Sequence, residues 1–284
     1  MTTKGAFIFC TLILGSLAVP RPEPDETFEF FDPVDPSARI VGGTVTPVGS
    51  DPHMVAMTSG TILTSFLCGG SIIGSRSVLT AAHCIDPNFG SGSLSRYLRV
   101  IVGTNTWRRG GQTFTLSGNA THPHYQKEPI LKNDIGILYT TTSMVYSQFI
   151  QPITMSFDFI GANVPVRAAG WGRTRRNGSI SSDLRALLMA TFDGQQCIDE
   201  VIQMGIATNM RPPAVEPHIE ICTKHEGGVG FGMCNGDSGS ALTRVSDGTQ
   251  IGVVSWSFPC ARGAPDVFVR ISAYEDWLVQ NIRD

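Results

Sequence analysis

The 284-residue chain contains few charged and few aromatic residues, 16% and 8% of the sequence, and its formal net charge is only −3. This balance argues against nucleic acid as a main partner, because binding to phosphates requires a strongly basic surface. Hydrophobic residues make up 42% of the chain, which is too many for a disordered protein and indicates a globular one with a large core. At this length the chain could form one large all-β domain or two smaller ones.

Long hydrophobic runs are absent from the chain beyond its N-terminal segment. No later segment approaches the ~20 apolar residues that a membrane-spanning helix needs. The one apolar run, Ala6–Val19, follows Lys4 and is too short for a comfortable span. Small residues at Ser16-Leu17-Ala18 fit a cleavage site, so residues 1–18 are predicted to be a secretory signal peptide; a signal anchor is the alternative. We therefore expect a secreted, extracellular protein without a membrane partner.

The next segment, residues 19–39, is rich in proline and acidic residues and contains nothing that suggests a packed domain. We interpret it as a propeptide. Residues 1–39 together carry six acidic and three basic residues, which leaves 18 of each sign in residues 40–284. The body of the protein is thus formally neutral and its leader is acidic.

The few cysteines of the chain indicate disulfide bonds. Of the seven cysteines, Cys10 leaves with the signal peptide, and the remaining six in a secreted chain suggest three disulfides. The spacing alone leaves 15 pairings open.

Secondary-structure patterns favour an all-β protein. Short β-rich runs broken by turns are typical of barrels or sandwiches. A helix is expected near the C-terminus, where apolar residues recur at helical spacing, and a shorter one over Cys197–Met204. The expected strands are Met54–Met57, Ile62–Leu67, Ser71–Ile73, Tyr97–Val102 and Thr113–Leu116, and the C-terminal helical positions are Tyr274, Trp277, Leu278 and Ile282.

The segment Met233–Ser240 carries the clearest chemical signal, because it holds Ser238 between an aspartate and a glycine. A serine hydroxyl is a weak nucleophile, so it needs a base, and the base needs an orienting partner. His83, in Ala81-Ala82-His83-Cys84, and Asp134, in Asn133-Asp134-Ile135, are the candidates. The order His, Asp, Ser is that of the chymotrypsin arrangement and not that of subtilisin or the α/β-hydrolases.

Several short motifs follow one another along the chain: Ile40-Val41-Gly42-Gly43, Cys68-Gly69-Gly70-Ser71, Ala81-Ala82-His83-Cys84, Asn133-Asp134-Ile135, Gly170-Trp171-Gly172, Gly236-Asp237-Ser238-Gly239 and Ser255-Trp256. With these motifs in this order, the sequence from Ile40 to its C-terminus resembles the trypsin/chymotrypsin family of serine endopeptidases. The resemblance implies an all-β fold of two packed six-stranded antiparallel β-barrels, chymotrypsin-like, with a C-terminal helix and the site between the barrels. Residues 40–284 would be this peptidase domain.

The resemblance also implies roles for residues. Ser238 would attack the scissile carbonyl, His83 would act as general base and then acid, and Asp134 would orient the imidazole. The backbone N–H groups of Gly236 and Ser238 would form the oxyanion hole. Cleavage after Arg39 would free an ammonium on Ile40, which would insert beside Asp237.

The family pattern selects one set of disulfides, Cys68–Cys84, Cys197–Cys222 and Cys234–Cys260. Two sequons, at Asn119 and Asn177, are candidate glycosylation sites. The run Arg173-Thr174-Arg175-Arg176 is interpreted as a solvated loop and a candidate for proteolytic nicking.

The expected specificity pocket departs from that of trypsin. Gly232 occupies the floor position where trypsin has aspartate, whereas Asp266 stands on the back wall where trypsin has glycine, a pairing that resembles arthropod collagenolytic proteases. Asp266 could attract a basic P1 side chain and leave room for apolar ones, which predicts a broad or mixed preference. Alternatively, Asp266 bonds to backbone and the enzyme is chymotrypsin-like, or a one-residue shift puts Phe231 or Met233 at the floor. The expected pocket residues are Gly232, Ser255, Trp256, Ser257 and Asp266.

We expect no cofactor and no metal. There is no Asp or Glu between Pro87 and Lys127, where relatives bind calcium through carboxylates, and Pro265 replaces the aromatic residue of sodium-activated relatives. The expected partners are protein or peptide substrates, an activating protease or the enzyme itself, and protein protease inhibitors, with the protein a monomer. The alternative function is that of a catalytically silent homologue acting as a binding module; a lipase or esterase is disfavoured by the triad order.

Overall fold

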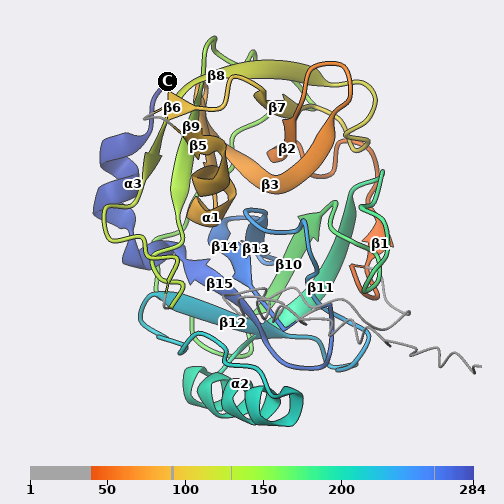
Figure 1. The fold of residues 1–284 in the computed structure, drawn as a ribbon, viewed down its shortest axis with the longest axis vertical. Coiled ribbons are helices and arrows are strands. Elements are labelled where there is room, and N and C mark those ends of the chain that lie inside the picture. The colour runs from red at the N-terminus through yellow and green to blue at the C-terminus, as the bar shows by residue number, and fades with distance from the viewer. Residues whose placement is uncertain (1–39, 91–92, 129, 259) are drawn as a thin grey trace, which may run out of the picture.

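The computed structural model describes residues 40–90, 93–128, 130–258 and 260–284. The expected signal peptide, the propeptide and Arg39 therefore lie outside the described residues. Strands dominate, and they form two closed antiparallel barrels stacked one above the other in Figure 1. The predicted all-β, two-barrel architecture with a C-terminal helix is confirmed.

The first barrel contains the N-terminal strands and closes on itself in the order β2-β3-β4-β9-β8-β7. Its interior is apolar, since Val55, Val78 and Ile137 are fully buried. A small hairpin, β5 (Phe89–Gly90) with β6 (Ser93–Leu94), stands outside it. The barrel strands are β2 (Met54–Ser59), β3 (Ser65–Gly74), β4 (Ser77–Thr80), β7 (Leu98–Val102), β8 (Gln112–Thr121) and β9 (Gly136–Thr140).

The second barrel has the order β11-β10-β13-β14-β15-β12, and pairing of β12 with β11 closes it. The short strand β1 (Thr44–Val45) adds to the outside of β11. The barrel strands are β10 (Pro165–Gly170), β11 (Arg185–Phe192), β12 (Glu220–Lys224), β13 (Ala241–Arg244), β14 (Gln250–Trp256) and β15 (Asp266–Arg270).

Two segments of the first barrel that were expected as separate strands form a single strand. The segments predicted at Ile62–Leu67 and Ser71–Ile73 belong to the continuous strand β3, which begins only at Ser65. Ile62 and Leu63 instead lie in the connection from β2 and are 93% and 89% exposed, because the hairpin has to turn there. An apolar pair without a period does not distinguish a strand from such a turn.

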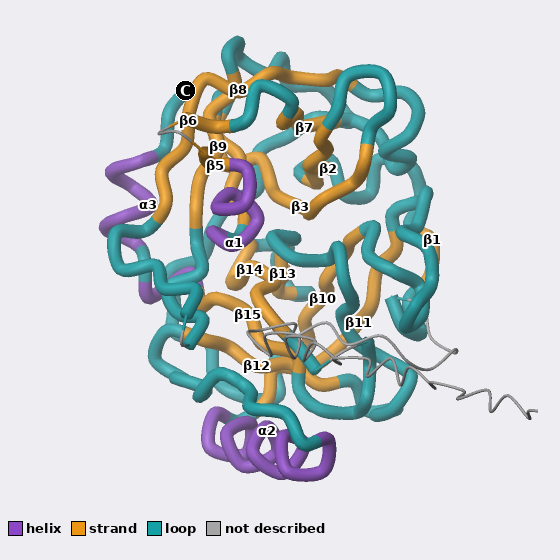
Figure 2. The backbone as a smooth tube through the Cα atoms, in the orientation of Figure 1, coloured by secondary structure: helices purple, strands orange, loops and turns teal. Residues whose placement is uncertain are grey.

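Helices are few and lie outside the barrels (Figure 2). The C-terminal α3 (Glu275–Asn281) packs on the first barrel through the fully buried Leu278. The expected helix at Cys197–Met204 is the longer α2 (Gly194–Thr208), whose N-terminus is capped by Asp193. The remaining helical turns are α1 (Ala82–Ile85), η1 (Asp86–Asn88) and η2 (Ile271–Ala273).

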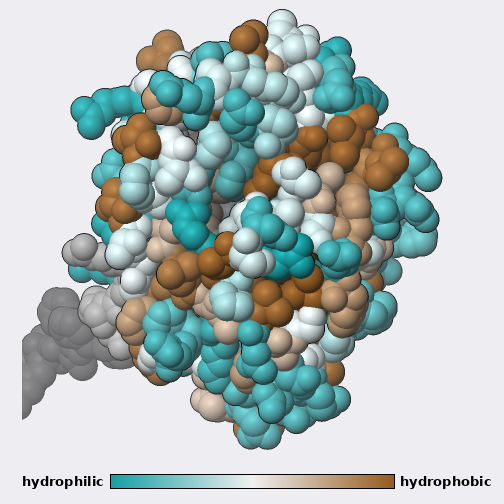
Figure 3. Space-filling model, turned by 180° about the vertical axis from the view of Figure 1, so that it is seen from behind, coloured by the Kyte–Doolittle hydropathy of each residue, from teal (hydrophilic) through white to brown (hydrophobic). Residues whose placement is uncertain are grey.

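The barrels contact each other through an apolar cluster to which both contribute. Met54 and Trp107 from the first barrel pack there with Trp171 and Ala241 from the second. On the surface, the face opposite that of Figure 1 carries hydrophobic patches among polar residues (Figure 3). Among the described residues, no helix is long and apolar enough to cross a membrane.

Candidate active site

The junction of the two barrels holds the three side chains that the sequence singled out. His83 lies on α1, which directly follows β4 and sits between the barrels in Figures 1 and 2. A disulfide between Cys68 on β3 and Cys84 ties this short helix to the barrel wall. The imidazole is 19% exposed, so it is held in place while one edge stays accessible.

Asp134 binds His83 twice. One carboxylate oxygen, Oδ2, lies 2.7 Å from Nδ1 of the imidazole, and the other, Oδ1, accepts the backbone N–H of His83 at 2.8 Å. Oδ2 also accepts the hydroxyl of Ser255 at 2.6 Å. Burial works to lower the pKa of His83, but the charge of Asp134 and its hydrogen bond outweigh it, so that the pKa is raised. The arrangement fixes the tautomer that leaves Nε2 as the proton acceptor.

Ser238 lies between two tight turns in the segment that connects β12 to β13. Gly236 and Gly239 have φ of 97° and 80°, a left-handed conformation that favours glycine. The Ser238 carbonyl accepts the N–H of Gly69 on β3, at 2.8 Å, which attaches the serine segment to the first barrel. Within the described part of the chain, the N–H groups of Gly236 and Ser238 take part in no backbone hydrogen bond. They are therefore free to bind an oxygen atom.

Close backbone approach explains why glycine stands at Gly69 and Gly239. A Cβ on Gly69 would lie 2.1 Å from the Ser240 hydroxyl, and one on Gly239 would lie 2.2 Å from Thr80 Oγ1. A larger residue at either position would therefore push the serine segment away from the first barrel.

Asp237 is completely buried next to the serine. Its carboxylate accepts the N–H of Gly172 at 2.8 Å and that of Cys234 at 3.0 Å. These two bonds do not offset burial, which raises the pKa of Asp237 to about 7. Ile40 is also fully buried and belongs to the core of the second barrel. Among the described residues, the Asp237 carboxyl group thus has two hydrogen-bond donors but no cationic partner. A buried carboxylate without such a partner is costly.

Asp266 opens β15 and lies opposite Gly232, where a Cβ would be 2.8 Å from Asp266 Oδ2. The carboxylate accepts the backbone N–H of Met233 at 2.9 Å, so it bonds to backbone while facing the glycine. Burial raises its pKa to about 8; the hydrogen bonds from Met233 and from the Ser257 hydroxyl work against this rise, and the nearby charge of Asp237 adds to it.

The neighbours of Gly232 are occupied elsewhere. Phe231 stacks on His225 with ring centroids 4.1 Å apart and packs over Gly42, whereas Met233 is buried in the second core. Trp256 closes β14 beside Ser255 and is 4% exposed.

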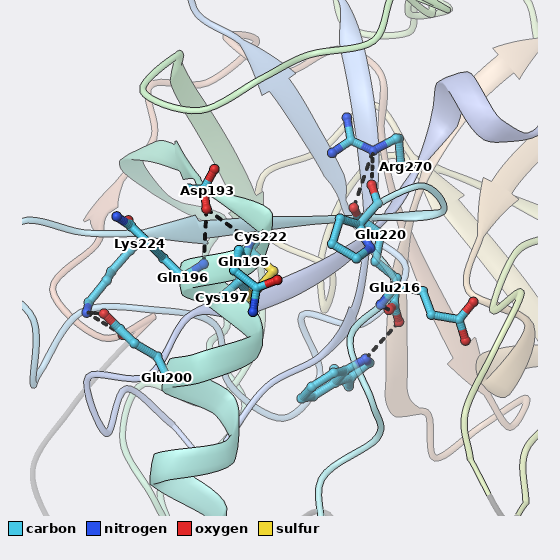
Figure 4. Close-up of a disulfide and its surroundings, with 12 residues drawn as sticks. Asp193, Gln195, Gln196, Cys197, Glu200, Glu216, Glu220, Cys222, Lys224 and Arg270 are labelled. Atoms are coloured by element: carbon cyan, nitrogen blue, oxygen red, sulfur yellow. Dashed lines mark hydrogen bonds and ion pairs between the residues drawn. A yellow bond between two sulfur atoms is a disulfide. The ribbon is translucent and has the colours of Figure 1, made fainter.

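Three disulfides join the six cysteines in the pairs Cys68–Cys84, Cys197–Cys222 and Cys234–Cys260. The second links α2 to β12, next to the Asp193 carboxylate that accepts the N–H groups of Gln195 and Gln196 at 3.0 Å each (Figure 4). The third attaches the segment before Ser238 to the segment after Trp256.

One group of described residues brings metal-binding atoms together. Cys68, His83 and Cys84 have sulfur and nitrogen atoms within 4.8 Å of one another. Both sulfurs are bonded in a disulfide, so neither is available as a thiolate ligand. The two sequons differ in setting: Asn119 lies in β8 and bonds to Thr121, whereas Asn177 is exposed in a loop at φ 57°.

Two features of the site were not recognised in the sequence. Ser255 was assigned to the pocket, but its hydroxyl donates to Asp134, and 121 residues separate the two. The buried pair of Lys132 and Glu220 belongs to no motif in the sequence. Lys132 stands two residues before Asp134, and that proximity to a motif was the only available signal.

Comparison with known proteins shows the family of the chain. The family model described as Trypsin matches residues 40–278. The chain is 32% identical to a protein named chymotrypsin-2 from Vespa crabro over 243 residues, 85% of this chain and 99% of that one. It is 31% identical to trypsin alpha-4 from Lucilia cuprina, covering 85% and 86% of the two chains. A protein named serine protease SP24D, from Anopheles gambiae, is 32% identical over 87% of this chain and 82% of its own.

Proposed function

The chain belongs to the trypsin family and is a serine endopeptidase, and we propose that it is secreted as a zymogen that becomes active when the bond after Arg39 is cut. The observation that carries the catalytic part of this proposal is the continuous hydrogen-bonded series from Ser255 through Asp134 to His83, which places a correctly oriented imidazole between the barrels. Three disulfides support secretion, because such bonds persist in oxidising compartments.

The proposed reaction is acyl transfer to water. Nε2 of His83 takes the Ser238 proton as the hydroxyl oxygen attacks the scissile carbonyl, and the imidazolium then protonates the leaving amine. Asp134 stabilises that imidazolium, in line with the raised pKa of His83. Water enters with His83 again as base and releases the acyl group from Ser238.

The free N–H groups of Gly236 and Ser238 would stabilise the oxyanion of each tetrahedral intermediate. A single donor of this kind is typically worth ~3 kcal/mol of barrier. The hydrogen bond from Arg173 N–H to the carbonyl of Asn235, at 2.8 Å, supports the turn that orients the first of them.

Activation would give the Asp237 carboxylate a cationic partner. Cutting after Arg39 turns the backbone nitrogen of Ile40 into an ammonium, and this cation would pair with the buried Asp237 carboxylate. A neighbouring positive charge lowers the pKa of a carboxyl group and offsets the cost of its burial. The match of the family model from Ile40 onward supports a mature chain that begins there.

A broad or mixed P1 preference follows from Asp266. A neutral carboxyl group opposite Gly232 tolerates apolar side chains, whereas the ionised group attracts lysine or arginine. Protein and peptide substrates and protein inhibitors would bind in this groove, and the activator would be another protease or the enzyme itself. We propose that the protein acts as a monomer.

Peptidase activity should appear when the bond after Arg39 is cleaved. The full chain is purified, treated with a trace of trypsin and assayed on a peptide library, with N-terminal sequencing of the product. We expect activity to rise as Ile40-Val41-Gly42-Gly43 appears as the new N-terminus, and Arg39→Gln to block both. A chain that is cut there and stays inactive would instead be a silent homologue that binds without hydrolysing.

A further inference from the structure

A lysine and a glutamate from different barrels form an ion pair in the interior, close to Asp134. Lys132 comes from the segment that leads into β9 of the first barrel, and Glu220 is the first residue of β12 in the second. Lys132 Nζ lies 2.7 Å from Glu220 Oε2, and the two side chains are only 8% and 6% exposed. The pair is therefore a polar contact across the barrel junction.

Every polar group of this pair has further partners. Lys132 Nζ also donates to the Ala214 carbonyl at 2.5 Å and lies 3.6 Å from the Glu216 carboxylate. Glu220 accepts the Glu216 N–H at 2.6 Å and the indole N–H of Trp256 at 3.3 Å. Figure 4 shows Glu216 and Glu220 together, on the opposite side of the disulfide from Lys224 and Glu200.

The segment that carries Lys132 also carries the triad carboxylate, and β14, which bonds to Glu220, holds that carboxylate from the second barrel. On the first barrel, Lys132 and Asp134 flank Asn133, whose left-handed turn at φ 50° separates the directions of their side chains. On the second, Trp256 bonds to Glu220 while its neighbour Ser255 bonds to Asp134. Two parallel connections thus join residues 132–134 to residues 255–256.

A buried ion pair seldom stabilises a protein more than well-packed apolar residues of the same volume would. The value of such a pair lies in fixing one geometry, because each charge loses its compensation as soon as the partner moves. Here the geometry that would be fixed is that of Asp134 and of the Trp256 indole.

We propose that Lys132 and Glu220 are positioning residues, which hold the Asp134 segment and the Trp256 indole in their working places across the barrel junction. This inference rests on the proposed function, since it assumes that Asp134 acts through His83 and that Trp256 borders the substrate. Without the pair, the Asp134 segment is held to the second barrel by the Ser255 hydroxyl, and the indole loses its acceptor. A small displacement of a catalytic group is costly in rate.

The test replaces the pair without leaving an unpaired charge. The double variant Lys132→Met with Glu220→Leu fills a similar volume with apolar atoms, and it is compared with the wild type after activation. We expect kcat to fall about 10- to 100-fold for both a small ester and a peptide, because both require His83. KM should also rise, because Trp256 is one of the expected pocket residues and loses the Glu220 carboxylate that accepts its indole N–H. If the pair had only a structural role, a double variant with an unchanged unfolding midpoint would keep the kcat and the KM of the wild type.

The matched control is the ion pair of Lys224 and Glu200, which joins β12 to α2 on the opposite side of the disulfide from Glu220 (Figure 4). Its double variant, Lys224→Met with Glu200→Leu, should keep kcat and KM within twofold of the wild type. If the first double variant does not fold, Glu220→Gln, which keeps the side-chain shape, is measured against the same criteria.

The outcomes separate this inference from the proposed function. If the activated wild type hydrolyses neither substrate, the proposed function fails. If the wild type is active and a folded variant of the pair has the same kcat and KM, the positioning role is wrong and the pair is structural only.

Discussion

The hydroxyl of Ser255 donates to Asp134 Oδ2 at 2.6 Å, so a residue of the second barrel holds the carboxylate that the first barrel carries. The same oxygen lies 2.7 Å from Nδ1 of His83. The orientation of the imidazole therefore depends on how the two barrels are packed, and not on the first barrel alone.

Ser255→Ala should lower kcat about tenfold, because a hydrogen bond to a charged group contributes ~1.5–3 kcal/mol and only part of it acts in the transition state. The matched control is Ser71→Ala, which also removes one buried hydroxyl, that bonded to Gln250 at 2.8 Å. Both variants should lose similar stability in urea. Equal kcat values for the two variants would show that the Ser255 bond has no catalytic effect.

The uncut chain should become less stable as pH rises from about 4 to 7. Burial raises the pKa of Asp237 from 3.8 to about 7, so in this range the folded chain binds more protons than the unfolded one. The stability present below pH 4 is thus lost as the carboxyl group ionises, by on the order of 4 kcal/mol at most.

Unfolding midpoints at several pH values, compared between the uncut wild type and Asp237→Asn, measure this loss. The Asp237→Asn variant should lack the part of this stability loss that comes from Asp237. Asp266 still titrates in the wild type and in the variant. The cut wild type should lose less than the uncut one, because the Ile40 ammonium would favour the charged carboxylate. Parallel pH profiles for wild type and variant would contradict the assigned cause.

The preference for basic over apolar P1 residues should increase between pH 6 and 9. Burial raises the pKa of Asp266 to about 8, so its negative charge becomes available only toward the upper end of this range. The ratio of kcat/KM for an arginine and a leucine peptide cancels the titration of His83, which both substrates share. Asp266→Asn should lower this ratio about tenfold at pH 9 and make it independent of pH. A ratio that stays unchanged in the variant would mean that Asp266 only binds the Met233 N–H.

The two-barrel fold was predictable from the family resemblance, and the candidate triad residues were found because they lie in motifs with local signals. The glycines around Ser238 and the short motifs at His83 and Asp134 mark turns whose chemistry is visible in the sequence. The longer extent of α2 also had a local signal, since Asp193 is a good N-cap and Asn209 ends the helix at φ 52°.

Long-range polar contacts were not predictable in the same way. Lys132 and Glu220 are 88 residues apart, and Ser255 and Asp134 are 121 apart, so nothing in their neighbourhoods specifies the partner. Each contact depends on the register of two barrels against each other. Ile62 and Leu63 were misassigned for a different reason, because two exposed apolar residues in a turn imitate the start of a strand.

The most direct test of the central claim is covalent labelling of the activated enzyme by a fluorophosphonate, located by peptide mass spectrometry. We expect a single phosphonyl adduct on Ser238, none in Ser238→Ala, and labelling slowed about a thousandfold in His83→Ala. An activated wild type that stays unlabelled, or that carries the adduct on another serine, would contradict the account.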